Sequence, residues 1–322
     1  MNKNLIYVIL IICGAMIAYI ILGGVFKNDL KKTAKNPYEY DLGDIKHIDS
    51  ALIRYRETKR IAVGFPMPKV ISYYNGLLGI GYDNSLQVID TSGREYFNKP
   101  INGTVTSLTF STQGNIYLGC KNYIEIHNLE GELLDSWSII DSSAYITAIV
   151  IKDENVFIAN ASGAIVYQCN LSGEILHSFD GKNRTGSKHG FIIPSPYFDM
   201  ELDSDGQLWV ANTGVQAIEN YNDDGSLRAY WGASSYDVSG FIGCCNPAQF
   251  TILSDDSFVT CEKGLVRIKV YLPSGELESV VATPDDFDVN SEPPDLAADE
   301  TNNIYVLDIT RKLIRKFERK DS

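Results

Sequence analysis

The sequence predicts an all-β protein, a single six-bladed β-propeller preceded by one N-terminal transmembrane helix. Three observations carry this prediction. A strand phrase recurs six times after residue 50, a glycine turn recurs about every 40 to 50 residues, and residues 5–26 form one long apolar run. Repeats of that length, each holding several short strands, are typical of propeller blades. One ring of such blades accounts for most of the 322 residues.

The N-terminal residues are predicted to form a membrane anchor. From Leu5 to Phe26 the chain is apolar except for tyrosine and glycine, which is long enough for a helix across a bilayer. A cleaved signal peptide has a shorter apolar core and a small-x-small cleavage site, and no convincing site follows this run. Cys13 does not fit a lipoprotein signal, because bulky Ile12 precedes it. We expect an uncleaved signal anchor over residues 1–26, a polar stalk over 27–50 and the propeller over 51–322.

Two signals conflict over which side of the membrane holds the propeller. Lys3 and the amino terminus precede the apolar run, whereas four lysines between residues 27 and 35 follow it. Positive charge favours the cytoplasmic side, so this count favours a cytoplasmic propeller. An N-terminal anchor ahead of an acidic, β-rich domain is, by contrast, a common arrangement for export. We expect a single-pass protein with an extracytoplasmic propeller, periplasmic in a Gram-negative source, and the opposite orientation stays open.

Each repeat holds four short strands. The second strand of each copy is the easiest to align, and the six copies read "GLLGIGYD", "GNIYLGC", "ENVFIAN", "GQLWVAN", "DSFVTC" and "NNIYVLD". The turn between the third and fourth strands reads "VIDTSG", "IHNLEG", "QCNLSG", "NYNDDG" and "VYLPSG". The last copy stops near Phe317, after its third strand. We expect the segment "SALIRYRETKRIAVGF" to supply the missing strand, because a closed ring leaves no open sheet edge.

These phrases resemble the NHL family of propellers. "HGFIIPSPYFDMELDSDGQLWVANTGVQAIENYNDDG" and "PPDLAADETNNIYVLDITRKLIRKF" follow the family pattern, and the first three copies match it more loosely. The resemblance covers roughly residues 55 to 318 and implies the architecture. NHL-like propellers include protein-binding scaffolds, RNA binders, lyases and sugar-lactone hydrolases, so the resemblance alone does not set a function.

Long loops are predicted to gather on one face of the ring. The first strand of a blade starts, and the second ends, on the face that holds the loops between blades. Two of these loops, residues 181–193 and 232–247, are enlarged, and long loops on a rigid scaffold often bind partners. The sequence therefore predicts a binding face for a protein or another ligand, with aromatic anchors at Trp231 and Tyr236. Its candidate residues are His189, Trp231, Tyr236, Phe241, Glu262 and Lys263.

Three cysteines are expected on the same face. Cys244 and Cys245 are adjacent in the second long loop, and Cys261 ends the second strand of the same blade. A structural disulfide from Cys244 or Cys245 to Cys261 is one interpretation. A metal or redox site of thiolates with nearby histidine or glutamate is another, and it suits a periplasmic redox or metal accessory protein. The third interpretation is inert, buried thiols.

Polar residues at the ends of second strands suggest a further hypothesis. Asn160, Asn212 and Asp308 could bind a divalent cation at the channel mouth through oxygen, as sugar-lactonase-like propellers do. The alternative is that these are ordinary turn residues after a strand. The lactonase pattern has an aspartate just before a first strand, where this sequence has Phe198 followed by Asp199. That departure ranks a metal-dependent lactonase or lyase third among the functional hypotheses.

Composition excludes several other functions. The formal net charge is −13 and no basic stripe is present, so we expect no nucleic-acid partner. The chain has no G-x-S-x-G elbow, phosphate-binding loop or H-E-x-x-H motif. The leading hypothesis is a non-catalytic, membrane-tethered propeller that binds a protein or ligand. The cofactor is unknown, with a divalent metal as one option.

Overall fold

The computed structural model describes residues 46–64, 67–138, 142–182 and 189–320, together with Tyr7, residues 11–17 and Tyr19. The chain divides into two compact units, Met1–Asp44 and Ile45–Ser322. Among the residues described, no helix is both long and apolar enough to cross a membrane. Most of the predicted anchor at residues 1–26 and of the predicted stalk at 27–50 lies outside the described residues.

The second unit is an all-β propeller of six four-stranded antiparallel sheets, as the sequence predicts. Blade 1 holds β2 (Pro68–Tyr74), β3 (Leu77–Tyr82), β4 (Ser85–Asp90) and β5 (Glu95–Pro100). Blade 2 holds β6 (Ser107–Phe110), β7 (Ile116–Cys120), β8 (Tyr123–His127) and β9 (Leu133–Ser138). Blade 3 holds β10 (Ile146–Lys152), β11 (Asn155–Asn160), β12 (Ile165–Asn170) and β13 (Ile175–Phe179).

The remaining blades complete the ring. Blade 4 holds β14 (Met200–Leu202), β15 (Leu208–Asn212), β16 (Ala217–Tyr221) and β17 (Leu227–Trp231). Blade 5 holds β18 (Gln249–Ile252), β19 (Phe258–Cys261), β20 (Ile268–Tyr271) and β21 (Leu277–Ala282). Blade 6 holds β22 (Asp295–Ala298), β23 (Ile304–Asp308), β24 (Leu313–Arg319) and β1 (Tyr55–Ala62). Two short 3-10 helices, η1 (Ser50–Leu52) and η2 (Pro284–Asp286), lie outside the sheets.

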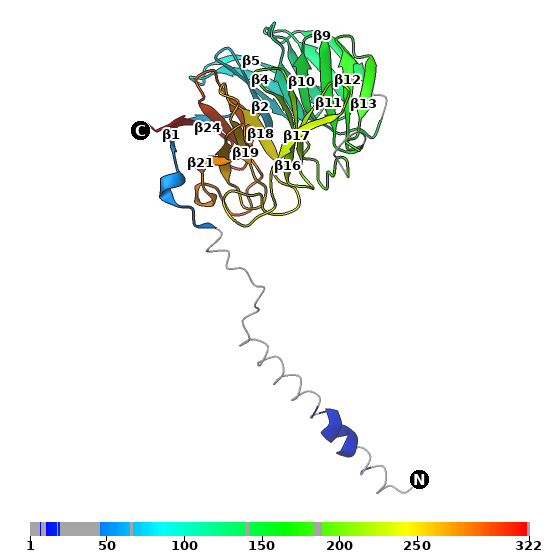
Figure 1. The fold of residues 1–322 in the computed structure, drawn as a ribbon, viewed down its shortest axis with the longest axis vertical. Helices are drawn as coiled ribbons and strands as arrows, with labels where there is room; N and C mark the ends of the chain where they lie inside the picture. Colours follow the sequence, from blue (N-terminus) through cyan, green and yellow to red (C-terminus); the bar gives the residue numbers. More distant parts are fainter. Residues whose placement is uncertain are drawn as a thin grey trace. The chain divides into compact units, whose positions relative to one another are not determined.

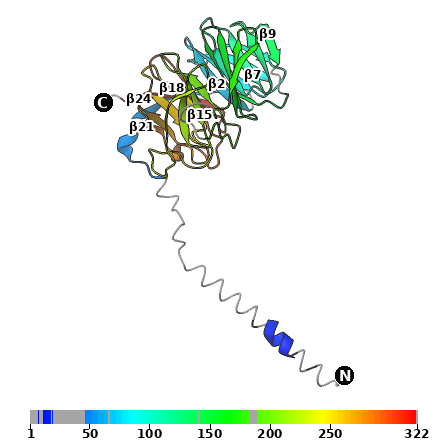
Figure 2. The same ribbon diagram turned by 45° about the vertical axis from the view of Figure 1, so that its right-hand side comes forward.

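The first strand of each blade lines the axis of the ring. β2, β6, β10, β14, β18 and β22 contact one another in a closed cycle, and the sheets lie side by side around it (Figure 1, Figure 2). Buried apolar side chains fill the space between neighbouring blades. Phe179 of blade 3, for example, packs against Phe191 and Tyr221, with ring centroids 5.9 and 5.3 Å away. The hydrophobic core therefore lies between neighbouring sheets, around the ring, rather than at its centre.

The predicted turns between third and fourth strands are confirmed. Their glycines all have positive φ, between 76° and 95°, and each backbone N–H donates to the carbonyl three residues earlier: Gly93, Gly131, Gly173, Gly225 and Gly275. Glycine enters this region without the steric cost other residues meet. At Gly225 a Cβ would also lie 2.5 Å from the Phe179 side chain of the neighbouring blade. The turn glycines thus allow the tight hairpin, and at Gly225 the missing side chain also lets the neighbouring blade pack close.

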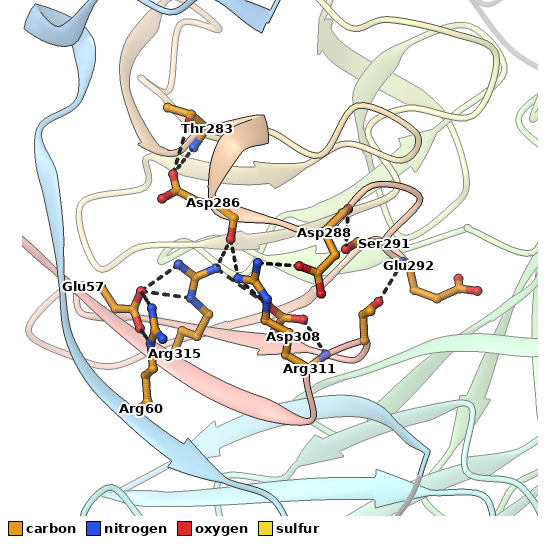
Figure 3. A network of polar contacts seen from close by, with 11 residues as sticks. Glu57, Arg60, Thr283, Asp286, Asp288, Ser291, Glu292, Asp308, Arg311 and Arg315 are labelled. Carbon is orange, nitrogen blue, oxygen red and sulfur yellow. Dashed lines mark hydrogen bonds and ion pairs between the residues drawn. The ribbon is translucent and has the colours of Figure 1, made fainter.

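The N-terminal strand closes the ring, also as predicted. β1 pairs antiparallel with β24, from Tyr55 opposite Arg319 to Ala62 opposite Leu313, and we call this pairing the seam. Arg315 of β24 is buried, and its Nη2 donates to Glu57 of β1 at 2.7 Å. Figure 3 shows the same guanidinium reaching the Asp286 carbonyl, 3.0 Å away. Residues far apart in the chain are thus joined by both a strand ladder and a buried ion pair.

Replacing Glu57 with glutamine is expected to lower the free energy of unfolding by about 2 kcal/mol, because buried Arg315 would lose the carboxylate to which it donates hydrogen bonds and keep only Asp308, whose Oδ2 lies 3.7 Å from its Nη1. Denaturant unfolding measured by circular dichroism gives the difference. Arg60→Gln is the matched control, since Arg60 bonds the same carboxylate from an exposed position. Its effect should be much smaller than that of Glu57→Gln, because Arg60 is exposed to solvent. Equal effects of the two substitutions would contradict a specific role for the buried pair.

Candidate functional site

Two cavities lie on the ring axis. The cavity nearer the loops between blades, called the mouth, has a volume of about 440 Å³ and is lined by residues from all six blades. These residues stand at or before the starts of first strands, and in the β23–β24 loop at Ile309, Thr310 and Lys312. The mouth therefore opens on the face that holds the loops between blades. A volume of this size is typical of ligand-binding pockets.

The second cavity, called the channel, runs between the first strands of the blades and has a volume of about 240 Å³. Val70, Thr147 and Gln249 line both cavities, so the mouth and the channel adjoin. The two cavities form one funnel along the axis. This funnel is the candidate functional site.

The mouth combines aromatic, charged and apolar side chains. Tyr145 and Tyr197 lie on its wall with Lys69, Lys312 and Glu292. The Tyr197 hydroxyl lies 3.5 Å from Glu292, and the ammonium of Lys263 stands 5.1 Å from the centre of the Tyr197 ring. Burial, and then the Glu292 charge, raises the pKa of Tyr197, so the phenol stays protonated at neutral pH. The wall can thus stack on a flat group and also donate or accept hydrogen bonds.

The channel is acidic. Asp199, Glu201 and Asp295 line it, and no lysine or arginine does. Oδ2 of Asp199 accepts the Phe250 N–H of blade 5 at 2.8 Å, and Oδ2 of Asp295 accepts the Ile71 N–H of blade 1 at 2.7 Å. Each aspartate therefore bonds its own blade to the next, while its carboxyl group lines the channel.

These three residues are half-buried, but their carboxyl groups lie deep in the channel wall, and the pKa values reflect that position. Burial, followed by the Glu201 and Asp295 charges, raises the pKa of Asp199 well above its usual range. Burial, followed by the Asp295 charge, raises the pKa of Glu201 to about 8. Burial raises the pKa of Asp295 to about 7, although backbone N–H groups oppose that shift. The channel thus holds groups that exchange protons near neutral pH.

Asn160, Asn212 and Asp308 organise the loops of their own blades. Asn160 accepts the N–H groups of Tyr145 and Ser162. Asn212 accepts the Ile192 N–H, and Asp308 accepts the Arg311 N–H. Within the described ranges, no group of three or more histidine, cysteine, aspartate or glutamate side chains is arranged to hold a metal ion. The contacts agree with the turn-residue interpretation of these positions.

Three of the residues expected on the binding face are inside the protein. Trp231 is 8% exposed and packs against Phe258 and Tyr271, with ring centroids 5.0 and 4.8 Å away. Phe241 is 1% exposed and Glu262 is fully buried. The predicted aromatic anchor at Trp231 is therefore a core residue between blades 4 and 5 and cannot reach a partner from that position.

Glu262 instead holds the long loop of residues 232–247 in place. Its carboxylate pairs with Arg267 and Lys269 at 2.8 Å each, and all three side chains are buried. Oε2 of Glu262 accepts the Ile242 N–H, while Lys269 donates to the carbonyl of Gly240 at 2.7 Å. Burial lowers the pKa of Lys269 to about 8. The loop is bound to blade 5 by a buried ionic cluster.

Other predicted residues are exposed on the loop face. Tyr236 is 50% exposed, and Lys263 and His189 are also exposed. Burial raises the pKa of Glu219, and the nearby His189 ring opposes that shift. Residues 183–188, in the first long loop, lie outside the described residues. None of the six predicted binding-face residues lines the mouth, although Lys263 reaches it through Tyr197.

The cysteines separate into a pair and a buried residue. The Sγ atoms of Cys244 and Cys245 are 3.4 Å apart, and no disulfide joins them. Cys261 is fully buried, with its thiol 3.8 Å from the Glu262 carbonyl. In this structure Cys244, Cys245 and Cys261 are free thiols.

The sequence did carry a signal for the acidic channel. Asp199 and Glu201 stand two residues apart around the first strand of blade 4, and a spacing of two places side chains on one face of a strand. Asp295 opens the first strand of blade 6. Acidic residues on the innermost strand of a propeller indicate a polar channel wall. The mouth residues left no comparable pattern, because they come from short segments near the starts of six first strands and from the β23–β24 loop.

Comparisons with known proteins support the fold. No family model and no curated protein sequence matches the chain. A streptogramin B lyase structure superimposes with a TM-score of 0.61 at 14% identity, over 84% of this chain and 100% of that one. Virginiamycin B lyase from Staphylococcus aureus gives a TM-score of 0.56 at 17% identity, over 79% and 82%. A catalytically inactive histidine-to-alanine variant of the latter enzyme, with quinupristin, gives 0.53 at 17%, over 81% and 88%.

The likeness is one of fold. Identities of 14–17% establish a six-bladed propeller with structural neighbours among these lyases. The NHL resemblance remains an expectation from the repeat phrases.

The stability of the propeller is expected to fall as pH rises from about 5 to about 8. In that window the folded chain keeps protons on Glu201 and Asp295, whose pKa values are about 8 and 7. The unfolded chain has already released them, because free carboxyl groups titrate near pH ~4. Each retained proton lowers the free energy of unfolding by up to about 1.4 kcal/mol per pH unit.

Urea unfolding at several pH values measures this slope. A chain carrying both Glu201→Gln and Asp295→Asn should show a shallower slope, while Glu154→Gln, in an exposed turn, should behave as wild type. Identical slopes in the wild type and the double variant would show that these carboxyl groups do not retain protons in the fold.

Proposed function

We propose that this chain is a membrane-tethered binding propeller that takes a cationic segment of a protein or peptide into its axial funnel. The acidic channel beneath a mixed aromatic and polar mouth carries the proposal. Three carboxyl groups share the channel, and burial and mutual repulsion oppose their ionisation. An ammonium group placed among them would relieve that repulsion, so binding energy is available to a positively charged ligand.

An organic cation fits this channel better than a metal ion. The described carboxylates are not arranged as a metal-ligand set. A cavity of about 240 Å³ has room for an ammonium group and its alkyl chain. Above it, Tyr145 and Tyr197 offer surfaces for the adjoining backbone, as aromatic residues do in many binding sites. A lysine side chain on a partner protein matches this combination.

A lyase-type enzyme is the second candidate, and the structural neighbours favour it. The catalytically inactive variant among them replaces a histidine with alanine. In this chain no histidine lines the described walls of the mouth or the channel. A reaction that depends on a histidine therefore finds none among the described residues that line the funnel, which favours binding over catalysis.

The tether is the second part of the proposal. Residues 5–26 have the length and apolar composition of a spanning helix. The chain enters β1 at Tyr55, opposite Arg319, and this end of the seam is remote from the β23–β24 loop at the mouth.

A lysine peptide is the direct test of binding. Acetyl-Gly-Lys-Gly-amide at about ten times its dissociation constant should raise the melting temperature by about 2 °C, since it binds only the folded chain. The same peptide with an acetylated lysine side chain should have no effect, because it lacks the charge. Glu201→Gln with Asp295→Asn should abolish the shift, and Glu154→Gln should keep it. Equal shifts with both peptides, or none at any concentration, would refute the proposal.

Labelling of Cys244 tests the tether and its orientation. The thiol is exposed, so a membrane-impermeant maleimide should label it in intact cells that make the full chain. The protein should also stay with the membranes after an alkaline carbonate wash. Cys244→Ser is the control for the labelled position. Labelling only after the cells are broken would place the propeller in the cytoplasm, and release by carbonate would remove the tether.

A further inference from the structure

The adjacent thiols of Cys244 and Cys245 lie in the loop between β17 and β18, outside the funnel walls. Their sulfur atoms are 3.4 Å apart. Cys244 is exposed, whereas the Cys245 side chain is 9% exposed. One thiol is therefore open to reagents in solution, and the other lies directly behind it.

The backbone around the pair is fixed by its neighbours. The Asn246 side chain donates to the carbonyls of Ile242 and Lys263, and it accepts the Lys263 N–H at 2.6 Å. The Gln216 side chain donates to the Gly243 carbonyl. Together with the Glu262 bond to the Ile242 N–H, these contacts hold both sides of the pair. The closeness of the two sulfurs is thus built into the loop.

The surroundings favour exchange chemistry over a permanent staple. Lys263 lies near Cys245, and a neighbouring ammonium favours the thiolate that such chemistry needs, although burial raises the pKa of Cys245 overall. Cα atoms of adjacent residues are about 3.8 Å apart, below the ~4.4–6.8 Å usual across a disulfide. A bond between adjacent cysteines is strained and easily reduced. Cys261 stays apart from this chemistry, because it is fully buried.

We propose that Cys244 and Cys245 form a thiol–disulfide exchange site that closes reversibly on meeting a small-molecule disulfide. The Cys244 thiolate attacks one sulfur of the reagent, breaks its S–S bond and releases one thiol. The Cys245 sulfur then attacks the Cys244 sulfur of the mixed disulfide and releases the second thiol. Two electrons pass from the cysteine sulfurs to the reagent, which leaves as two thiols carrying the two protons.

Glutathione disulfide is the probe for this site. The full chain is incubated with it, alkylated before any reduction and mapped by mass spectrometry. The peptide containing both cysteines should lose two hydrogens and resist alkylation, and dithiothreitol should restore both thiols. Cys120→Ser, which removes a buried thiol in blade 2, is the control and should leave this result unchanged.

Two single variants assign the roles. Cys245→Ser should trap glutathione on Cys244, because no second thiol is left to displace it. Cys244→Ser should react at least ten times more slowly, since the remaining thiol is shielded. A bond from either cysteine to Cys261, a lasting glutathione adduct on wild-type Cys244, or no reaction in the wild type would each overturn the proposal. These results do not depend on peptide binding in the funnel.

Discussion

Closure of the ring at the seam is the constraint on which the remaining structure depends. The mouth and the channel exist only where six first strands converge, so their walls are made of residues distant in sequence. Lys69 of blade 1 and Thr310 of blade 6, for example, line the same cavity. The Asp295 hydrogen bond to Ile71 crosses this same boundary between blades 6 and 1. Opening the seam would therefore disturb the funnel as well as one sheet.

Backbone hydrogen bonds and a buried ion pair both stabilise the seam. A ladder of backbone hydrogen bonds joins β1 to β24, and Arg315 is enclosed by Glu57, by a backbone carbonyl and by the rings of Phe287 and Phe317. A buried cation is costly unless its donors are satisfied, and here they are. The pair therefore specifies which strand completes blade 6, because another strand would leave the guanidinium without its carboxylate.

Much of the fold could be predicted from the sequence because it is repeated. Six similar second strands, five turn glycines and an incomplete last copy together indicated six blades and their closure. The site was harder, because it depends on how loops fold back on the ring. Trp231 precedes the long loop of residues 232–247, Phe241 lies within it and Glu262 follows the second strand of the same blade, so all three were expected on the loop face. Tyr271 and Lys269 of β20, with Arg267 just before that strand, pack against or pair with them. These partners lie elsewhere in the sequence, so the residues around each position did not indicate that it is buried.

The channel shows how one set of groups can serve the scaffold and the site together. Asp199 and Asp295 bond successive blades through backbone N–H groups, which stabilises the inner ring. The same placement sets acidic groups close together inside the ring, where burial raises the pKa of each and their ionisation is costly to the folded state.

The seam also has a consequence for biosynthesis. Glu57 and Arg315 are 258 residues apart, so at about 5–20 residues per second the ribosome finishes the partner of β1 roughly 13 to 50 s after β1 itself. During that interval β1 is an unpaired strand, which is a template for aggregation. Its sequence, YRETKRIA, places charged residues at four of its eight positions. Charges of this kind disfavour pairing with strands of other molecules, so β1 is protected from aggregation until β24 has been synthesised.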